Sequence, residues 1–129
     1  MYLKNKEKGI VIDLINGVVL SSDSSGMLCS QTIKMGSKEV SLLKYLAKNS
    51  GYVISKTELL HHVWRDQNVH ENTVLVTLSG IRKIFRKAEL DCRCIVTIAK
   101  FGYIFYPRRA GLEMEGFNDS GKHSMLWFN

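Results

Sequence analysis

The first third of the chain alternates short apolar runs with polar turn residues. Asn16-Gly17, between two such runs, is a dipeptide that favours a tight hairpin turn with positive φ. Ser, Asp and Gly residues at 21–26 indicate a loop. The pattern predicts an antiparallel sheet of three or four strands, with strands at residues 10–12, 18–20, 27–29 and 32–35.

After Gly36 the apolar residues recur at helical spacing. Ser37 is suited to cap a helix that ends at Asn49-Ser50-Gly51. Ser55 and Glu58 have capping-box spacing at the start of a second helix, after a short extended piece at 52–54. The predicted buried faces of these two helices are Val40, Leu43, Leu46 and Ala47, and Leu59, Leu60, Val63 and Trp64.

A third helix is predicted at about residues 71–87, after a polar loop at 65–70. Its buried stripe would be Val74, Leu78, Ile81 and Phe85. The opposite face would carry small, polar and basic side chains, namely Asn72, Thr73, Val76, Thr77, Gly80 and Lys83, flanked by Arg82, Arg86 and Lys87.

Two β-rich runs, 94–98 and 101–106, predict a C-terminal hairpin with Ala99-Lys100 at its tip, ended by Pro107. We expect one α+β domain at residues 9–109. Residues 1–8 would be an N-terminal extension, and residues 110–129 a flexible, weakly acidic tail with an apolar cluster at 125–128.

The composition and charge indicate which kind of partner the chain binds and where in the cell it is expected. The 129 residues are 45% hydrophobic, and 18 Lys and Arg against 12 Asp and Glu give a net charge of +6, which suits a polyanionic partner. Residues 55–109 hold ten basic against five acidic residues. No apolar run approaches the roughly 20 residues of a membrane span, and no signal-peptide core follows the basic start, so we expect a cytoplasmic, nucleoid-associated protein.

The sequence offers little chemistry for catalysis. Three cysteines, Cys29, Cys92 and Cys94, fit reduced thiols better than a zinc site completed by His61 or His62. We find no nucleophile with a base, no phosphate-cradling glycine loop and no metal-ligand set, so we expect no enzyme, cofactor or metal.

Two helices joined by a polar loop and followed by a hairpin form a winged helix-turn-helix. A major groove about 12 Å wide admits one helix, and flanking cations neutralise phosphates. A basic hairpin tip can reach the neighbouring minor groove. The predicted DNA-binding residues are Asn72, Thr73, Val76, Thr77, Gly80, Arg82, Lys83, Arg86, Thr97 and Lys100. Val76 would touch a thymine methyl group, and Arg82 would bind phosphate or pair with an acid within the fold.

Residues 9–107 resemble the OmpR/PhoB-type winged-helix domain. The matching motifs, in order, are Ser37–Leu43, Val53–Leu60 with Val63-Trp64, Thr73-Val74 with Leu78-Ser79 and Ile81–Lys83, and Ile95 to Tyr103. Gly80 and Ala99 stand where response regulators usually carry arginines, and Leu75 stands where they often have an acid. Thr97–Tyr103 is closer to the T-V-P-K-x-G-Y pattern of the ToxR/CadC-like branch.

The resemblance implies a sequence-specific regulator that binds double-stranded DNA, with no room in 129 residues for the receiver domain of response regulators. It leaves open RNA polymerase or a sensor protein as a further partner, and a dimer on tandem half-sites. A protein-interaction module on the same scaffold is the alternative, which deletion of residues 110–129 would distinguish. Glycine costs a helix about 1 kcal/mol relative to alanine, so Gly80→Ala is expected to raise stability and, if DNA approaches there, to change affinity.

Overall fold

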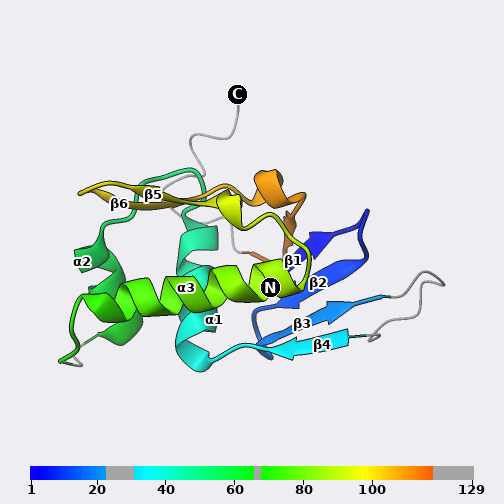
Figure 1. Cartoon of the computed structure of the whole chain (residues 1–129), viewed down its shortest axis with the longest axis horizontal. Coiled ribbons are helices and arrows are strands. Elements are labelled where there is room, and N and C mark those ends of the chain that lie inside the picture. The colour runs from blue at the N-terminus through cyan, green and yellow to red at the C-terminus, as the bar shows by residue number, and fades with distance from the viewer. Residues whose placement is uncertain (23–30, 66–67, 118–129) are drawn as a thin grey trace.

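The computed structural model describes residues 1–22, 31–65 and 68–117 (Figure 1). Four strands, β1 (Tyr2–Asn5), β2 (Ile10–Asp13), β3 (Val18–Ser21) and β4 (Gln31–Lys34), precede the helices α1 (Ser37–Lys48), α2 (Lys56–Leu59) and α3 (Asn72–Lys87). The hairpin of β5 (Ile95–Ile98) and β6 (Gly102–Phe105) follows, and β7 (Glu113–Glu115) comes last. The predicted α+β winged helix-turn-helix architecture is confirmed.

β1 to β4 and β7 form one antiparallel sheet with the spatial order β4-β3-β2-β1-β7. The strands predicted at residues 10–12, 18–20 and 32–35 are confirmed with small shifts at their ends. The strand predicted at 27–29 lies outside the described residues.

The turn between β2 and β3 is fastened by the carboxylate of Asp13. It accepts hydrogen bonds from the backbone N–H groups of Ile15 and Asn16, at 2.8 and 3.0 Å, and from the Asn16 side chain at 2.8 Å. Burial acts to raise the pKa of Asp13, but these hydrogen bonds outweigh it and hold the pKa below its usual value. Gly17 has φ +70°, as the Asn-Gly dipeptide predicts.

The domain extends beyond both predicted boundaries. Residues 2–5, predicted as an extension, form β1 in the interior of the sheet, with β2 on one side and β7 on the other. Residues 113–115, predicted as tail, form β7, while 118–129 lie outside the described residues. Leu3 is fully buried, and the Asn5 side chain donates to the carbonyl of Ala110 at 2.9 Å. The predicted limits at residues 9 and 109 would therefore remove two strands of the sheet. Neither β1 nor β7 carries a long apolar run, so the apolar pattern does not predict them.

The helices begin at defined caps. Gly36, rather than the predicted Ser37, is the N-cap of α1, and its N–H donates to Oε1 of Glu39 at 2.7 Å. The predicted Ser55 cap of α2 is confirmed, because its Oγ accepts from the N–H of Glu58 at 3.0 Å. One turn of π-helix at Leu60–Trp64 continues α2. A carboxylate at the first turn stabilises a helix in both cases.

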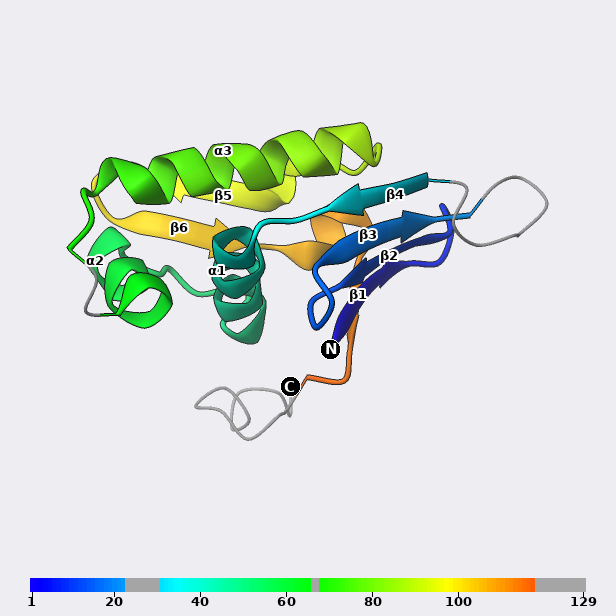
Figure 2. The same ribbon diagram turned by 90° about the horizontal axis from the view of Figure 1, so that it is seen from below.

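The core lies between the sheet and the helices, with α3 crossing α1 (Figures 1 and 2). The predicted stripe of α3 is confirmed, since Val74, Leu78, Ile81 and Phe85 are all fully buried. They pack in one cluster with leucines of α1 and aromatic residues of the hairpin. None of the helices in the described ranges is long and apolar enough to cross a membrane.

Candidate functional site

The exposed face of α3 is the broadest candidate surface. Its members recur every three or four residues and are Asn72, Leu75, Val76, Ser79, Lys83, Arg86 and Lys87. Val76 is 70% exposed and Leu75 is 42% exposed, which is unusual for large apolar side chains next to each other on a helix. The face is thus small and apolar in its first half and basic in its second half.

Two predicted members of this face do not lie on it. Thr77 is buried, and its hydroxyl donates to the carbonyl of Thr73 at 2.8 Å. Gly80 lies against α1, where a Cβ would overlap the carboxylate of Glu39. The half-buried Thr73 lies on the same side of α3. The sequence prediction therefore rotated the face too far toward α1.

Leu75 and Ser79 lie on the exposed α3 face and are not in the predicted set. Both continue the three- and four-residue spacing of Asn72, Val76 and Lys83, and both are exposed. This spacing was readable in the sequence. By helical spacing Leu75 lies on the side of Asn72, whereas Thr77 lies on the side of the buried Val74 and Ile81.

The two arginines of α3 have intramolecular partners. Arg82 donates from Nη2 to the carbonyl of Ile95 at 2.9 Å and to the hydroxyl of Thr97 at 3.0 Å. Among the described residues its hydrogen-bond partners are thus groups of β5 and not an acid. Arg86 is exposed, and its Nη1 lies 3.5 Å from Sγ of Cys92. Arg82 ties α3 to the hairpin, whereas the Arg86 guanidinium remains open to solvent.

The hairpin of β5, Ala99–Phe101 and β6 is called the wing below. Ala99, Lys100 and Phe101 are all exposed at its tip, and Lys100 has φ +68°. The predicted tip residue Lys100 and the strand residue Thr97 therefore face solvent at least in part. Figures 1 and 2 place this tip at the same end of the molecule as the N-terminal end of α3.

The wing is anchored to the segment before α2. The N–H of Ile54 donates to the carbonyl of Tyr103 at 2.8 Å, and the N–H of Tyr103 donates to the carbonyl of Ile54 at 2.9 Å. Gly102, with φ +149°, permits this approach because a Cβ there would overlap the Ile54 carbonyl. The extended piece predicted at residues 52–54 thus pairs with the wing through a single antiparallel β-bridge, between Ile54 and Tyr103.

Polar contacts also hold the first two helices together. The Tyr45 hydroxyl donates to the Glu58 carboxylate, and burial together with this bond raises the pKa of Tyr45 to about 12. His62 stacks on the Tyr45 ring with centroids 4.7 Å apart. His70 accepts from the N–H of Asn72 at 3.1 Å, next to the start of α3. These histidines therefore pack or cap within the fold.

The cysteines and acids form no metal centre in residues 1–22, 31–65 and 68–117, where no cluster of three or more His, Cys, Asp or Glu side chains could hold a metal. Cys92 and Cys94 are free thiols, the first half-buried and the second buried. Burial raises the pKa of Cys94 to about 12, so this thiol stays protonated at neutral pH. Cys29 lies outside the described residues.

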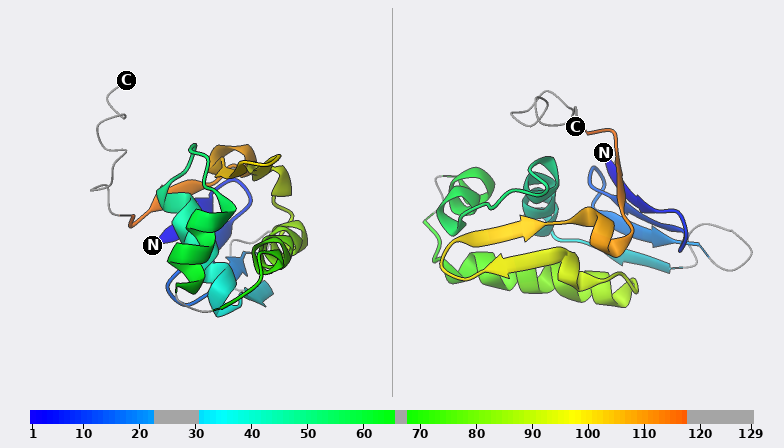
Figure 3. Two further views of the ribbon diagram at one scale, coloured as in Figure 1. Left: turned by 90° about the vertical axis from the view of Figure 1, so that its left-hand side faces the viewer. Right: turned by 90° about the horizontal axis from the view of Figure 1, so that it is seen from above.

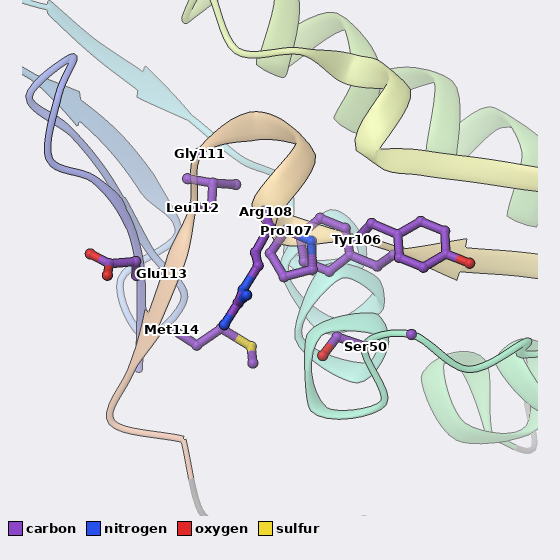
Figure 4. Close-up of a pocket in the computed structure, with 10 residues that line it drawn as sticks. Ser50, Tyr106, Pro107, Arg108, Gly111, Leu112, Glu113 and Met114 are labelled. Carbon is purple, nitrogen blue, oxygen red and sulfur yellow. The ribbon is translucent and has the colours of Figure 1, made fainter. Parts of the chain in front are cut away.

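A pocket of about 630 Å³ opens between the end of α1 and the chain that leads into β7 (Figure 4). Its lining is mostly apolar and aromatic, formed by Ser50, Gly51, Phe105, Tyr106, Pro107, Arg108, Gly111, Leu112, Glu113 and Met114. Figures 2 and 3 show β7 on the other side of the wing from α3. The pocket therefore contributes nothing to the exposed α3 face.

Comparison with known proteins identifies relatives. The family model described as "Transcriptional regulatory protein, C terminal" matches residues 30–105. The response regulator SaeR of Staphylococcus epidermidis is 39% identical over 92 residues, which are 70% of this chain and 40% of SaeR. The cholera toxin transcriptional activator of Vibrio cholerae is 28% identical over 116 residues, 88% of this chain and 38% of the activator. The chain thus spans about two fifths of the curated relatives it matches.

Solved structures show the same fold. The DNA-binding domain of CadC from E. coli superposes with a TM-score of 0.63 at 22% identity, covering 81% of this chain and 90% of that domain. The DNA-binding domain of the response regulator AdeR, solved in complex with an intercistronic region, gives a TM-score of 0.58 at 19% identity, covering 79% and 98%. The likeness thus extends to both the ToxR/CadC-like branch and the response regulators.

Proposed function

Because the chain belongs to the family of C-terminal domains of transcriptional regulatory proteins, we propose that it regulates transcription by binding specific sequences of double-stranded DNA. In this proposal α3 enters the major groove and the wing tip lies at the adjacent minor groove. The observation that carries it is the exposed α3 face, small and apolar toward the wing tip and basic farther along.

The exposure of each side chain in the structure changes which DNA contact we propose for it. Val76 and Leu75 would contact thymine methyl groups, while Asn72, Thr73 and Ser79 offer polar groups to base edges or phosphates. Lys83 and Arg86 would neutralise phosphates, and Thr97 and Lys100 would contact the DNA backbone near the minor groove. These roles all fall to side chains on α3 and the wing that face solvent at least in part.

Three predicted residues receive indirect roles. Arg82 would set the angle between α3 and the wing, because its guanidinium already bonds to two groups of β5. The buried Thr77 and the glycine at position 80 would fix how closely α3 packs on α1. Substituting any of these three residues would change DNA affinity by shifting the exposed α3 face or the wing.

The test is binding to a duplex selected from a random library, measured by fluorescence anisotropy at several salt concentrations. Neutralising about 5 phosphates predicts a slope near −4.5 in log K against log salt. Lys83→Ala should reduce this slope by about 1 and weaken binding to all sequences alike. Lys6→Ala is the matched control, since Lys6 is an exposed lysine whose nearest ion partner is Glu113 on the sheet.

A slope near zero for the full chain would contradict the proposal and favour a protein-interaction module, for which the exposed Leu75 and Val76 would form the contact. The deletion that tests such a module must start after Phe117. A cut at residue 110 would remove β7 and with it part of the sheet. Footprinting on the selected duplex would give the half-site spacing and the number of copies bound.

The family consists of regulatory domains and not of enzymes, so no catalytic step is proposed. A contact with RNA polymerase or with a sensor protein is a separate question. Copurification of the chain with RNA polymerase, in the presence and in the absence of the selected duplex, would show whether such a contact depends on DNA.

A further inference from the structure

The tip of the wing presents a large apolar side chain to solvent. Phe101 is 70% exposed, the highest value among the aromatic side chains that the structure describes as exposed. The residues before it, Ala99 and Lys100, are exposed as well. A phenyl ring held in water at a hairpin tip has no role in the core and is free to contact a partner surface.

This ring stands on a rigid base. The N–H of Phe101 donates to the carbonyl of Ile98 at 3.0 Å, which closes the tip. The next residue, Gly102, lies against the Ile54 carbonyl, and the paired hydrogen bonds of Ile54 and Tyr103 fix β6 there. On the other strand, Arg82 holds Ile95 and Thr97. The ring is thus carried by a hairpin fixed on both strands.

The chemistry of the tip differs from that of a basic wing. Ala99 provides no guanidinium to read the minor groove, so Lys100 is the single cation of the three tip residues. Apolar side chains that enter the minor groove insert between base steps, unstack them and kink the duplex by about 20–90°. A lysine beside the ring supplies the phosphate contact that would hold it in place.

We propose that Phe101 acts as an apolar wedge, which enters the minor groove beside the α3 site and partly unstacks one base step. This inference rests on the proposed DNA-binding function and adds to it a deformation of the duplex. The bound sequence should therefore carry an easily unstacked pyrimidine–purine step, such as TA or CA, at the position that the wing reaches.

The experiment uses the full chain and a selected duplex with 2-aminopurine at the step under the wing, because this base becomes brighter when it is unstacked. Wild-type protein should raise the emission and bend the duplex. Phe101→Ala should abolish both effects and weaken binding by about tenfold, the scale of one lost base–aromatic contact. The salt slope should not change, since no charge is removed. Phe101→Leu should retain much of the emission, because leucine is also an apolar wedge.

The matched control is Ile15→Ala, which removes a side chain 66% exposed in the turn between β2 and β3. It should leave emission, bend and affinity unchanged. An affinity loss in Phe101→Ala with emission and bend intact would overturn the wedge and point to a contact with sugars or with a second copy. Unchanged affinity and emission in that variant would overturn it too. A wild-type chain that binds DNA with a normal salt slope but without bending refutes the wedge alone, whereas absence of salt-dependent binding refutes both proposals.

Discussion

Gly80 has two opposing effects on the stability of the fold. A glycine inside a helix lowers stability by about 1 kcal/mol relative to alanine. Here it also leaves room for Glu39, whose carboxylate caps the N-terminus of α1 by accepting from the Gly36 N–H. The side chain missing from α3 thus permits a cap on α1, and this coupling could not be read from either helix alone.

Gly80→Ala is therefore expected to change the free energy of unfolding by less than about 0.5 kcal/mol, because the gain in helix propensity is offset by the displaced cap. In the Glu39→Ala background the same substitution should stabilise by about 1 kcal/mol. Urea unfolding of the four proteins measures this coupling as a double-mutant cycle. An equal gain in both backgrounds would show that Glu39 does not meet the new methyl group.

At the scale of the element, the wing depends on close contacts with two other segments. Arg82 joins it to α3, and Ile54 joins it to the chain before α2. Figure 3 shows β5 and β6 lying along α3 for much of its length. A two-stranded hairpin is marginally stable by itself, so these attachments set its position.

Gly102→Ala should destabilise the fold by about 3 kcal/mol or more, since backbone strain at φ +149° adds to an overlap with the Ile54 carbonyl. Gly51→Ala is the control, because Gly51 also has positive φ but has no atom within 4 Å of a new Cβ. It should lose only about 1–2 kcal/mol. Chemical denaturation compares the two, and equal losses would argue against the close approach of Gly102 to Ile54.

At the scale of the whole molecule, the large sheet joins the first strand to a strand that follows the wing. β1 lies between β2 and β7, so residues from the start of the chain and residues beyond 110 share one sheet. The surface ion pair of Lys4 with Glu115, at 3.2 Å, adds little, whereas the burial of Leu3 adds much. The sheet is therefore part of the domain and lies beside α1 (Figure 2).

Removal of residues 1–8 should lower the free energy of unfolding by about 3 kcal/mol or more, the scale of deleting a buried leucine together with its neighbours. Thermal unfolding followed by circular dichroism measures the loss. Glu7→Ala in the full chain is the control, because Glu7 is exposed in the turn after β1 and should change stability by less than about 0.5 kcal/mol. If the shortened chain were as stable as the full one, the domain would begin at residue 9, as the sequence predicts.

Local sequence determined most of the elements. Helical spacing predicted α3 and its four fully buried residues, and Asn16-Gly17 predicted the turn between β2 and β3. The Ser55 cap and the hairpin with Lys100 at its tip were predicted as well. These features depend on residues within a few positions of one another, and backbone propensity and periodicity act over that range.

Only the tertiary structure decided the features that depend on distant pairs. β1 has one fully buried apolar residue, and it lies inside the sheet because it pairs both with β2, the next strand, and with β7, more than 100 residues away. Thr77 and Gly80 were predicted to be exposed, but α1 covers that side of α3. The hydrogen bonds of Arg82 to β5 were not predicted from the sequence, which offered phosphate or an acid as its partner. Hydrophobic periodicity identifies which face of an element is buried. It does not specify which element covers the edges of that face, because this depends on how the packed elements cross.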